Sequence, residues 1–457
     1  MSPVRTLIRN GRVVTFDDAD HMAPRDVLVE DGRIAAIGPG LEAQDAGTID
    51  AADRIVIPGF VDTHRHTWQS IPRSVAADWT LGQYFTGVRG MLGPQYRPQD
   101  MYIANLLGTL EALDSGITTL VDWSHNMITP EHADAAYEGL RDSGSRAVLA
   151  YGSANDDWLN PEVRFDWSDV ARVKSRYFSA DDGLITLAVA PRGPEFCTLE
   201  LAEEELRVAR DLDLRITVHV GCGAWGLHRK VAALHERGLL GPDTTYVHCC
   251  TLADDELEMI AATGGTASVA PEVEMHMGHG FPATGRLLAA GIKPTLSIDV
   301  CTGIGGDFFG AMRAMLAMER SLRNSEHLEA GTAPEVLELT TGDILRFATI
   351  EGARAAGLDD RTGSIEVGKQ ADLVLIRADR LNMTPVNNPV GAVVLAAGVG
   401  NVDTVLVAGR VVKRDGELVG VDLDRVRRLA YESRDYLFER AGFEIGGRYA
   451  PTGVAAG

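Results

Sequence analysis

The segment Pro58–His66 constrains the fold of this chain more than any other. A short β-branched run precedes it, a Pro-Gly turn opens it, and a second strand runs into its His-x-His end. Side chains two residues apart share one face of a strand, so His64 and His66 can point at the same ion. Two unrelated histidines on a solvated strand give the same pattern, so the rest of the chain must decide between the two interpretations.

The central part of the chain alternates apolar, strand-like runs with helical periods, as a parallel α/β arrangement does. After the strand before His64, further strands are expected at residues 117–122, 147–151, 185–190, 215–220, 245–248, 266–270 and 294–299. Helices such as 199–211 and 310–322 fill the intervals. Eight strands in this order predict the α/β class and a (β/α)8 barrel.

The two ends of the chain predict a small β-domain. Short strands are expected at residues 6–9, 12–16, 26–29 and 33–38, with Asn10-Gly11 and Asp31-Gly32 as hairpin turn signals. The Asn-Gly-Arg-Val-Val near the start is echoed by Ala-Gly-Arg-Val-Val at 408–412. We therefore expect a β-sandwich from residues 1–57 and 366–420, a barrel from 58–365, and a C-terminal helix and tail from 421–457.

The composition is that of an ordinary globular protein: 457 residues, 45% hydrophobic and 24% charged. A net charge of −22 argues against a nucleic-acid or anionic-membrane partner. Five cysteines, two of them adjacent, do not resemble a disulfide framework. No secretion signal stands at the start, and no apolar run reaches ~18 residues. We expect a cytoplasmic protein with a small-molecule partner, and a homo-oligomer is compatible with these features.

Further candidate metal ligands lie at the ends of other predicted strands. His219 ends the fifth strand, His248 the sixth and Asp299 the eighth. The carboxyl ends of barrel strands converge on one mouth, where active sites are built. Catalytic zinc and similar divalent ions are held by a few His and carboxylate side chains, with one position left open for water. The sequence therefore predicts a metal site at the mouth of the barrel.

Two motifs resemble the metal-dependent amidohydrolase superfamily, and the similarity runs over almost the whole chain. Pro58–His66 resembles its strand-one motif, and Thr-Gly-Ser-Ile-Glu-Val-Gly-Lys-Gln-Ala-Asp-Leu-Val-Leu at 362–375 resembles its return into the β-sandwich. The mononuclear branch includes cytosine, guanine, S-adenosylhomocysteine and 8-oxoguanine deaminases and the triazine hydrolases. Resemblance to it implies the ligands His64, His66, His219 and Asp299. Residues 190–195 lack the lysine of the binuclear branch, so we expect one divalent ion, zinc first, with iron or manganese as alternatives.

The resemblance also implies a reaction. A metal-activated water would attack a C–N bond of a small heterocycle, which makes the chain a hydrolase, most simply an aminohydrolase (deaminase). His248 would orient the water or polarise the substrate, and Asp299 would accept the proton and pass it to the leaving group. One alternative is opening of a cyclic amide or amidine, or hydrolytic displacement as in triazine hydrolases. Another is a binding protein that keeps the fold without catalysis.

The sequence departs from the deaminase pattern at Cys222. The related deaminases have Glu three residues after the strand-five histidine, where it protonates a ring nitrogen of the substrate, and a thiol is a weaker acid. Cys222 is either a small apolar filler or a substrate contact, and a carboxyl from another loop is a candidate replacement. The candidate substrate-binding residues are Trp68, Gln69, His125, Glu195, Cys222, Glu272, Glu274 and His276. His276 and His279 are also weighed as ligands of a second metal.

Overall fold

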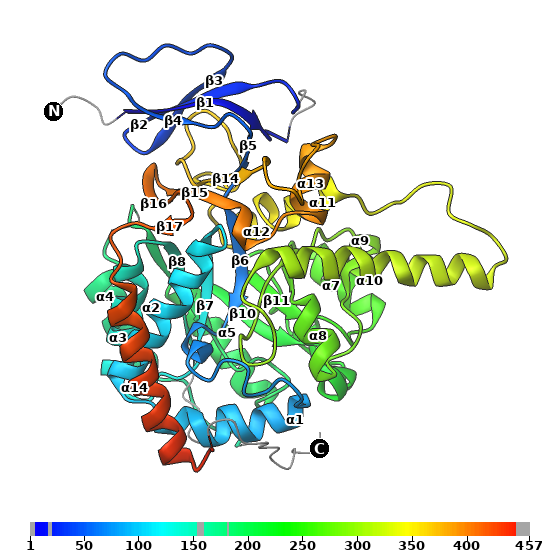
Figure 1. Cartoon of the computed structure of the whole chain (residues 1–457). Coiled ribbons are helices and arrows are strands. Elements are labelled where there is room, and N and C mark those ends of the chain that lie inside the picture. Colours follow the sequence, from blue (N-terminus) through cyan, green and yellow to red (C-terminus); the bar gives the residue numbers. More distant parts are fainter. Residues whose placement is uncertain (1–4, 17–20, 153–159, 181, 445–457) are drawn as a thin grey trace. The chain divides into compact units, whose positions relative to one another are not determined.

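The computed structural model describes residues 5–16, 21–152, 160–180 and 182–444 (Figure 1). The chain divides into two compact units. The first comprises Met1–Thr63, Leu110–Thr119 and Asp307–Val421, and the second His64–Thr109, Leu120–Gly306 and Asp422–Gly457. These units are not the predicted division into barrel and β-domain, so the boundaries at 57, 365 and 420 stay a prediction. The predicted tail after residue 444 lies outside the described residues.

Both ends of the chain contribute strands to one 9-stranded sheet in the first unit. Its order is β17-β16-β15-β14-β5-β1-β2-β3, and β4 pairs with β1. The strands are β1 (Arg5–Val13), β2 (Arg25–Glu30), β3 (Arg33–Gly38), β4 (Gly47–Asp50), β5 (Arg54–Pro58), β14 (Leu373–Arg377), β15 (Val402–Val407), β16 (Arg410–Arg414) and β17 (Glu417–Leu418). The antiparallel pairing of β5 with β14 joins the N-terminal strands to the C-terminal ones. The predicted β-domain from both chain ends is confirmed.

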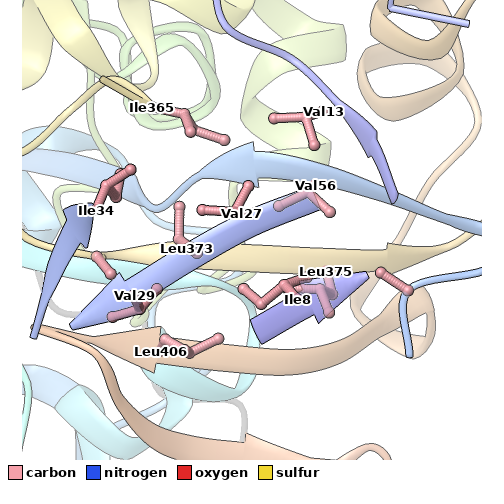
Figure 2. Close-up of a cluster of buried hydrophobic side chains, with 12 residues drawn as sticks. Ile8, Val13, Val27, Val29, Ile34, Val56, Ile365, Leu373, Leu375 and Leu406 are labelled. Atoms are coloured by element: carbon pink, nitrogen blue, oxygen red, sulfur yellow. The ribbon is translucent and has the colours of Figure 1, made fainter. Parts of the chain in front are cut away.

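A cluster of buried aliphatic side chains holds this mixed sheet together (Figure 2). Ile8, Val29 and Val56 come from the N-terminal strands, and Leu373 and Leu406 come from the C-terminal ones. Each is at most 2% exposed, and aliphatic side chains of this size gain about 1.5–3 kcal/mol each from burial. Because both ends contribute to one core, neither end buries its apolar face without the other.

The two turn signals near the N-terminus have different outcomes. Asp31 and Gly32 both have positive φ, 48° and 81°, and connect antiparallel β2 and β3 as predicted. The hairpin predicted at Asn10-Gly11 is wrong, since β1 runs through both residues and shifts its register against β2 there. Asn10 has φ 63°, and its N–H donates to Asp26 Oδ1 at 2.9 Å. One left-handed residue produces a bulge in the strand, whereas the type I′ hairpin turn that Asn-Gly favours needs two.

The eight predicted barrel strands form an 8-stranded sheet in sequential order from β6 to β13. The strands are β6 (Phe60–Arg65), β7 (Ile117–Ser124), β8 (Arg146–Gly152), β9 (Ile185–Ala190), β10 (Arg215–Val220), β11 (Thr244–His248), β12 (Thr266–Val269) and β13 (Thr295–Leu296). A parallel bridge between Arg65 and Asp299 connects its two edges. There the His66 N–H donates to the Asp299 carbonyl at 2.8 Å, and the Asp299 N–H to the His64 carbonyl at 2.9 Å. The predicted (β/α)8 barrel is confirmed. Its closing hydrogen bonds join the backbones of His64 and His66 to that of Asp299, and all three residues are candidate ligands.

The helices follow the predicted alternation with the strands. They are α1 (Leu81–Tyr84), η2 (a π-helix, Phe85–Leu92), α2 (Pro98–Asp114), α3 (Pro130–Ser143), α4 (Trp167–Tyr177), α5 (Leu199–Asp211), α6 (Lys230–Glu236), α7 (Asp254–Ala262), α8 (Pro271–Met277), α9 (Thr284–Ala289), α10 (Phe308–Glu329), α11 (Thr341–Phe347), α12 (Ile350–Ala355), α13 (Pro389–Leu395) and α14 (Leu423–Ala441). Short 3-10 turns are η1 (Thr67–Ser70), η3 (Gly93–Gln95), η4 (Gly223–His228) and η5 (Val399–Asn401).

Local capping explains where two of the predicted helices begin. The Thr198 hydroxyl accepts from the Leu201 N–H ahead of α5, and the Asp307 carboxylate accepts from two N–H groups of α10. The C-terminal helix α14 is anchored in the second unit, where Ser433 donates to the buried Asp100 at 2.6 Å. Among the described residues, no helix combines the length and apolar character needed to cross a membrane.

Candidate active site

The end of β6 brings two candidate ligands together as predicted. The rings of His64 and His66 lie with their centroids 4.7 Å apart, and both side chains are buried. Arg65 between them extends to a different environment, where it donates to the Gly306 carbonyl at 3.2 Å. The alternation of side chains along a strand therefore places both histidines on one side.

Nitrogen and oxygen atoms from three strand ends converge at one point. His64 Nε2 lies 3.2 Å and His66 Nε2 3.4 Å from Asp299 Oδ1. From β10, His219 Nε2 lies 3.3 Å from His64 Nε2. Two groups that include these residues, His64-His66-Asp299 and His64-His219-His248, each keep their candidate ligand atoms within 4.8 Å of one another.

The electrostatics of this cluster suit a cation. Burial lowers the pKa of His66 and His219 well below the ordinary value, so both imidazoles are neutral, as metal ligands must be. His66 Nδ1 donates to the Trp123 carbonyl at 2.8 Å, which leaves the Nε2 lone pair directed at Asp299 and His64. Neutral imidazole lone pairs this close to each other and to a carboxylate repel, and a divalent ion between them removes that repulsion. The donor set fits an ion with three His ligands and one carboxylate.

His248 stands beside this cluster and is held by a buried carboxylate. Its Nδ1 lies 3.1 Å from Glu274 Oε1, and its Nε2 lies 3.9 Å from Asp299 Oδ2. Burial alone would lower the pKa of His248, but the hydrogen bond with Glu274 and the charge of Asp299 raise it above the ordinary value. In its protonated form His248 carries on Nε2 a proton that it can donate.

A cavity opens beside these residues. Its walls combine histidines, aromatic rings, one arginine and one thiol: His66, Leu81, Tyr84, Phe85, Arg89, His125, Phe196, His219, Cys222, His248, Met277, His279, Asp299 and Val300. Apolar walls with a few polar groups are typical of small-molecule sites.

The sequence matches the profile of the Amidohydrolase family over residues 55–412. The chain belongs to this family. It is 31% identical to a 5'-deoxyadenosine deaminase of Methanothermobacter thermautotrophicus, over 90% of this chain and 95% of the relative. It is 29% identical to a 5-methylthioadenosine/S-adenosylhomocysteine deaminase of Desulforudis audaxviator, over 95% of this chain and all of the relative.

Solved structures agree with this assignment. An adenosine deaminase from Xanthomonas campestris with bound zinc has a TM-score of 0.81 and 25% identity, covering 95% of this chain and 99% of that one. The atrazine chlorohydrolase of Arthrobacter aurescens TC1, complexed with zinc, has the same TM-score at 23% identity, covers 94% of this chain and all of that one, and supports the fold alone. This amidohydrolase is therefore an enzyme of the deaminase-like branch, a metal-dependent hydrolase of C–N bonds other than peptide bonds.

Only two of the eight predicted substrate-binding residues line the cavity of this amidohydrolase, His125 and Cys222. Trp68 and Gln69 stand behind its wall: Trp68 Nε1 donates to His125 Nδ1 at 3.2 Å, and Gln69 Nε2 donates to the Tyr84 hydroxyl at 2.6 Å. Both therefore position residues that line the cavity.

The predicted carboxyl replacements are not among the cavity-lining residues either. Glu195 accepts from the backbone N–H groups of Gly221 and Cys222 at 2.5 and 3.2 Å, and burial raises its pKa to about 7. Glu274 contacts His248, as described above, and Glu272 is half-buried outside the cavity lining. His276 is exposed, whereas His279 is buried against His248, with ring centroids 4.7 Å apart. Since one of the two is exposed, the structure does not bring His276 and His279 together as a buried pair.

The Cys222 thiol lines the cavity. It is 3% exposed, and burial raises its pKa well above the ordinary value, so it stays a neutral thiol at physiological pH. A neutral thiol is a weak hydrogen-bond donor and a poor proton donor to a ring nitrogen. Among the described lining residues, Asp299 is the only carboxyl group.

The sequence prediction missed much of the cavity wall, including Tyr84, Phe85 and Arg89. They belong to α1 and η2, two short helical segments after β6. The six residues Tyr-Phe-Thr-Gly-Val-Arg at 84–89 show no periodicity from which an inward-facing side chain could be identified.

Proposed function

We propose that the chain is an aminohydrolase that binds one divalent ion, most simply zinc, through His64, His66, His219 and Asp299. The observation that carries the proposal is the convergence of their nitrogen and oxygen atoms at the mouth of the barrel. His64 Nε2 and His66 Nε2 lie 3.2 and 3.4 Å from Asp299 Oδ1, and His219 Nε2 lies 3.3 Å from His64 Nε2. A divalent ion bound there would supply a nucleophilic water near neutral pH. The ring cavity beside it would hold a small heterocyclic amine.

The chain's own residues would manage the protons of the reaction. Asp299 Oδ2 faces His248 Nε2 and is free to accept the proton of the attacking water and deliver it to the departing nitrogen. His248, made basic by Glu274, would donate its Nε2–H to the group attached to the attacked carbon. Water adds to the carbon, the C–N bond breaks, and ammonia leaves.

The relatives named above act on adenosine derivatives, and this supports an amino-substituted purine or a similar ring as the substrate class. Cys222 favours a second candidate, displacement or ring opening on a carbon that is already activated, because no carboxylic acid stands there to protonate a ring nitrogen. The buried thiols of Cys197, Cys222, Cys249, Cys250 and Cys301 support a reducing compartment, the cytoplasm.

A panel of amino-substituted purines, pyrimidines, pterins and triazines, offered to the zinc-loaded protein, tests the proposal. We expect one ammonia per product molecule, with a mass gain of about one unit where an amino group becomes an oxo group. A product formed without ammonia would establish displacement or ring opening instead. No turnover on the whole panel by protein that contains one ion per chain would contradict the aminohydrolase proposal.

A further inference from the structure

One side chain in the cavity wall has a buried nitrogen without a hydrogen-bond partner. His125 directly follows β7, is 1% exposed, and lines the cavity together with His66 and Asp299. Within the described part of the chain, its Nε2 atom has no hydrogen-bond partner. A buried polar atom in this state costs about 1–3 kcal/mol, which a ligand with a matching atom recovers. Which ligand atom matches depends on which ring nitrogen of His125 carries the proton.

The neighbours of Nδ1 determine this tautomer. Trp68 Nε1 and the Trp123 carbonyl oxygen each lie 3.2 Å from His125 Nδ1. Trp68 is fully buried, and its indole N–H can only donate, so it requires Nδ1 as an acceptor. The Trp123 carbonyl already accepts from the His66 Nδ1–H at 2.8 Å and from the His125 backbone N–H at 3.1 Å, which uses both of its lone pairs. An imidazole that accepts at Nδ1 is neutral, so His125 carries its proton on Nε2.

Close packing holds this N–H in place. Gly152, at the end of β8, lies against the backbone of His125, where a Cβ atom would stand only 2.7 Å from the His125 Cα and 2.8 Å from its Cβ. The ring of His125 also packs against that of His66, with centroids 4.1 Å apart. The donor is therefore fixed beside one of the proposed metal ligands. A donor that is already in position stabilises developing charge without reorganisation.

We propose that His125 is a catalytic residue, which donates its Nε2–H to the substrate's ring nitrogen next to the attacked carbon, and that Trp68 positions it by fixing the tautomer. This inference rests on the proposed aminohydrolase function and gives its substrate class, heterocycles with an unprotonated nitrogen at that place. It supplies a hydrogen bond to the ring that the thiol of Cys222 makes only weakly.

The electrons and protons of the step balance without a proton from His125. As water adds to the carbon and Asp299 takes one of its protons, the electron pair of the ring C=N bond moves to the ring nitrogen. The hydrogen bond from His125 stabilises that charge, as a neutral imidazole can. The bond to the amino group then breaks, and the pair on the ring nitrogen returns to the C=N bond. The amino group leaves as ammonia with the proton from Asp299, and the hydroxy product converts to its oxo form.

The first test reads the tautomer and needs no substrate. In zinc-loaded protein with 15N-labelled histidines, nitrogen chemical shifts separate protonated from unprotonated ring nitrogens. The signals of His125 are identified by their loss in His125→Phe or, if that variant does not fold, in His125→Gln. We expect a protonated Nε2 and an unprotonated Nδ1, and we expect Trp68→Phe, which removes the indole donor, to populate both tautomers. The control is His235→Phe, at an exposed position of α6, which should leave these signals unchanged. A protonated Nδ1 in the wild type would overturn the proposal, and a Trp68→Phe protein with the wild-type tautomer would overturn the role of Trp68.

The second test measures binding without reaction. Purine and benzimidazole both lack an amino group and differ in the two nitrogens of the six-membered ring. By calorimetry, we expect the wild type and His235→Phe to bind purine at least about fivefold more tightly than benzimidazole. His125→Phe should lose this preference while it keeps its metal content and thermal midpoint, and His125→Gln, which keeps an N–H donor, should retain part of it. A wild type without the preference, or a His125→Phe variant that retains it, contradicts the donor role.

The third test uses the substrate that the panel of heterocyclic amines identifies. We expect His125→Phe to lower kcat about 10²- to 10³-fold, the usual effect of removing one donor to a charged intermediate, and His125→Gln to lose less. A His125→Phe enzyme within tenfold of the wild type, or a His125→Gln enzyme no better than His125→Phe, would overturn the catalytic role. If no compound of the panel releases ammonia, the aminohydrolase proposal fails, and the tautomer and the purine preference still decide whether His125 is the donor.

Discussion

Glu274 Oε1 lies 3.1 Å from His248 Nδ1 and also accepts the backbone N–H of Ala270 at 2.8 Å. The carboxylate is thus fixed at the start of α8 and holds the imidazole with Nε2 directed at Asp299. A carboxylate behind a histidine sets both its tautomer and its orientation.

Replacing Glu274 should therefore impair catalysis through His248. We expect Glu274→Ala to lower kcat about 10²- to 10³-fold with little change in KM, and Glu274→Gln, which keeps the shape of the side chain, to lose less. Metal content, measured by mass spectrometry, should stay near one ion per chain, because Glu274 is not among the proposed ligands. A large rise in KM with unchanged kcat would instead show Glu274 to act on substrate binding.

His66→Ala should remove both the metal ion and turnover. The variant loses a nitrogen 3.4 Å from Asp299 Oδ1, and with it one of the four proposed ligands of the ion. His276→Ala is the matched control, since His276 is exposed and should keep both properties. Elemental analysis and ammonia release measure the two effects, and an active, metal-free His66→Ala protein would refute the assigned ligands.

Cys222→Ala should keep turnover within about tenfold of the wild type. The neutral thiol is a weak donor, and its removal leaves a small void at the cavity wall. Glu195→Gln should have the larger effect on stability, because the carboxylate accepts two backbone N–H groups. The opposite outcome would be a loss of turnover of about three orders of magnitude in Cys222→Ala, about 4 kcal/mol of transition-state stabilisation, while Glu→Gln variants at 195, 272 and 274 stay near wild type. That outcome would identify the thiol as the group that protonates the substrate.

Glu205 of α5 should make the protein less stable as the pH rises. It is fully buried, and burial raises its pKa from 4.5 to about 8. The folded state therefore holds a proton that the unfolded chain releases, so the contribution is fully present below pH 4.5 and is lost as the pH rises towards 8. Glu205→Leu removes this dependence, and its unfolding free energy should exceed that of the wild type by a margin that grows by a few kcal/mol between pH 5 and pH 8. Urea unfolding at both pH values measures the margin, and a constant difference would contradict the shifted pKa.

Leu406→Ala should destabilise the mixed sheet. Leu406 is fully buried among side chains from both chain ends, and truncation of such a leucine typically costs about 2–5 kcal/mol. Leu381→Ala is the control, because Leu381 is 98% exposed in the same unit. Hydrogen exchange should show weaker protection in β2 and β14 alike, and loss confined to the C-terminal strands would contradict a shared core.

The sequence predicted the fold and the candidate ligands because both follow from regular spacing. His64 and His66 obey the two-residue period of a strand, and His219, His248 and Asp299 each end a recognisable apolar run. The topology of the barrel then brings the carboxyl ends of the strands together independently of the conformations of the loops.

The remaining features depend on contacts between segments that have no fixed sequence spacing. Glu274 was predicted to touch substrate, but whether it faces the cavity or His248 depends on how α8 packs. Arg89 lies in a π-helix whose wider turn moves side chains away from the usual helical positions. Asn10-Gly11 has the composition of a hairpin turn. However, β1 pairs with both β2 and β5, and it therefore continues through these two residues as one strand.

The antiparallel pairing of β5 with β14 has a consequence for the newborn chain. Arg54–Pro58 emerges from the ribosome early, whereas its partner Leu373–Arg377 is made more than 300 residues later. At a synthesis rate of about 5–20 residues per second, β5 remains without β14 for roughly 15–60 seconds. During that interval the β-branched run Ile55–Ile57 presents an unpaired backbone edge, so chaperone occupancy during synthesis should be greatest on the N-terminal strands.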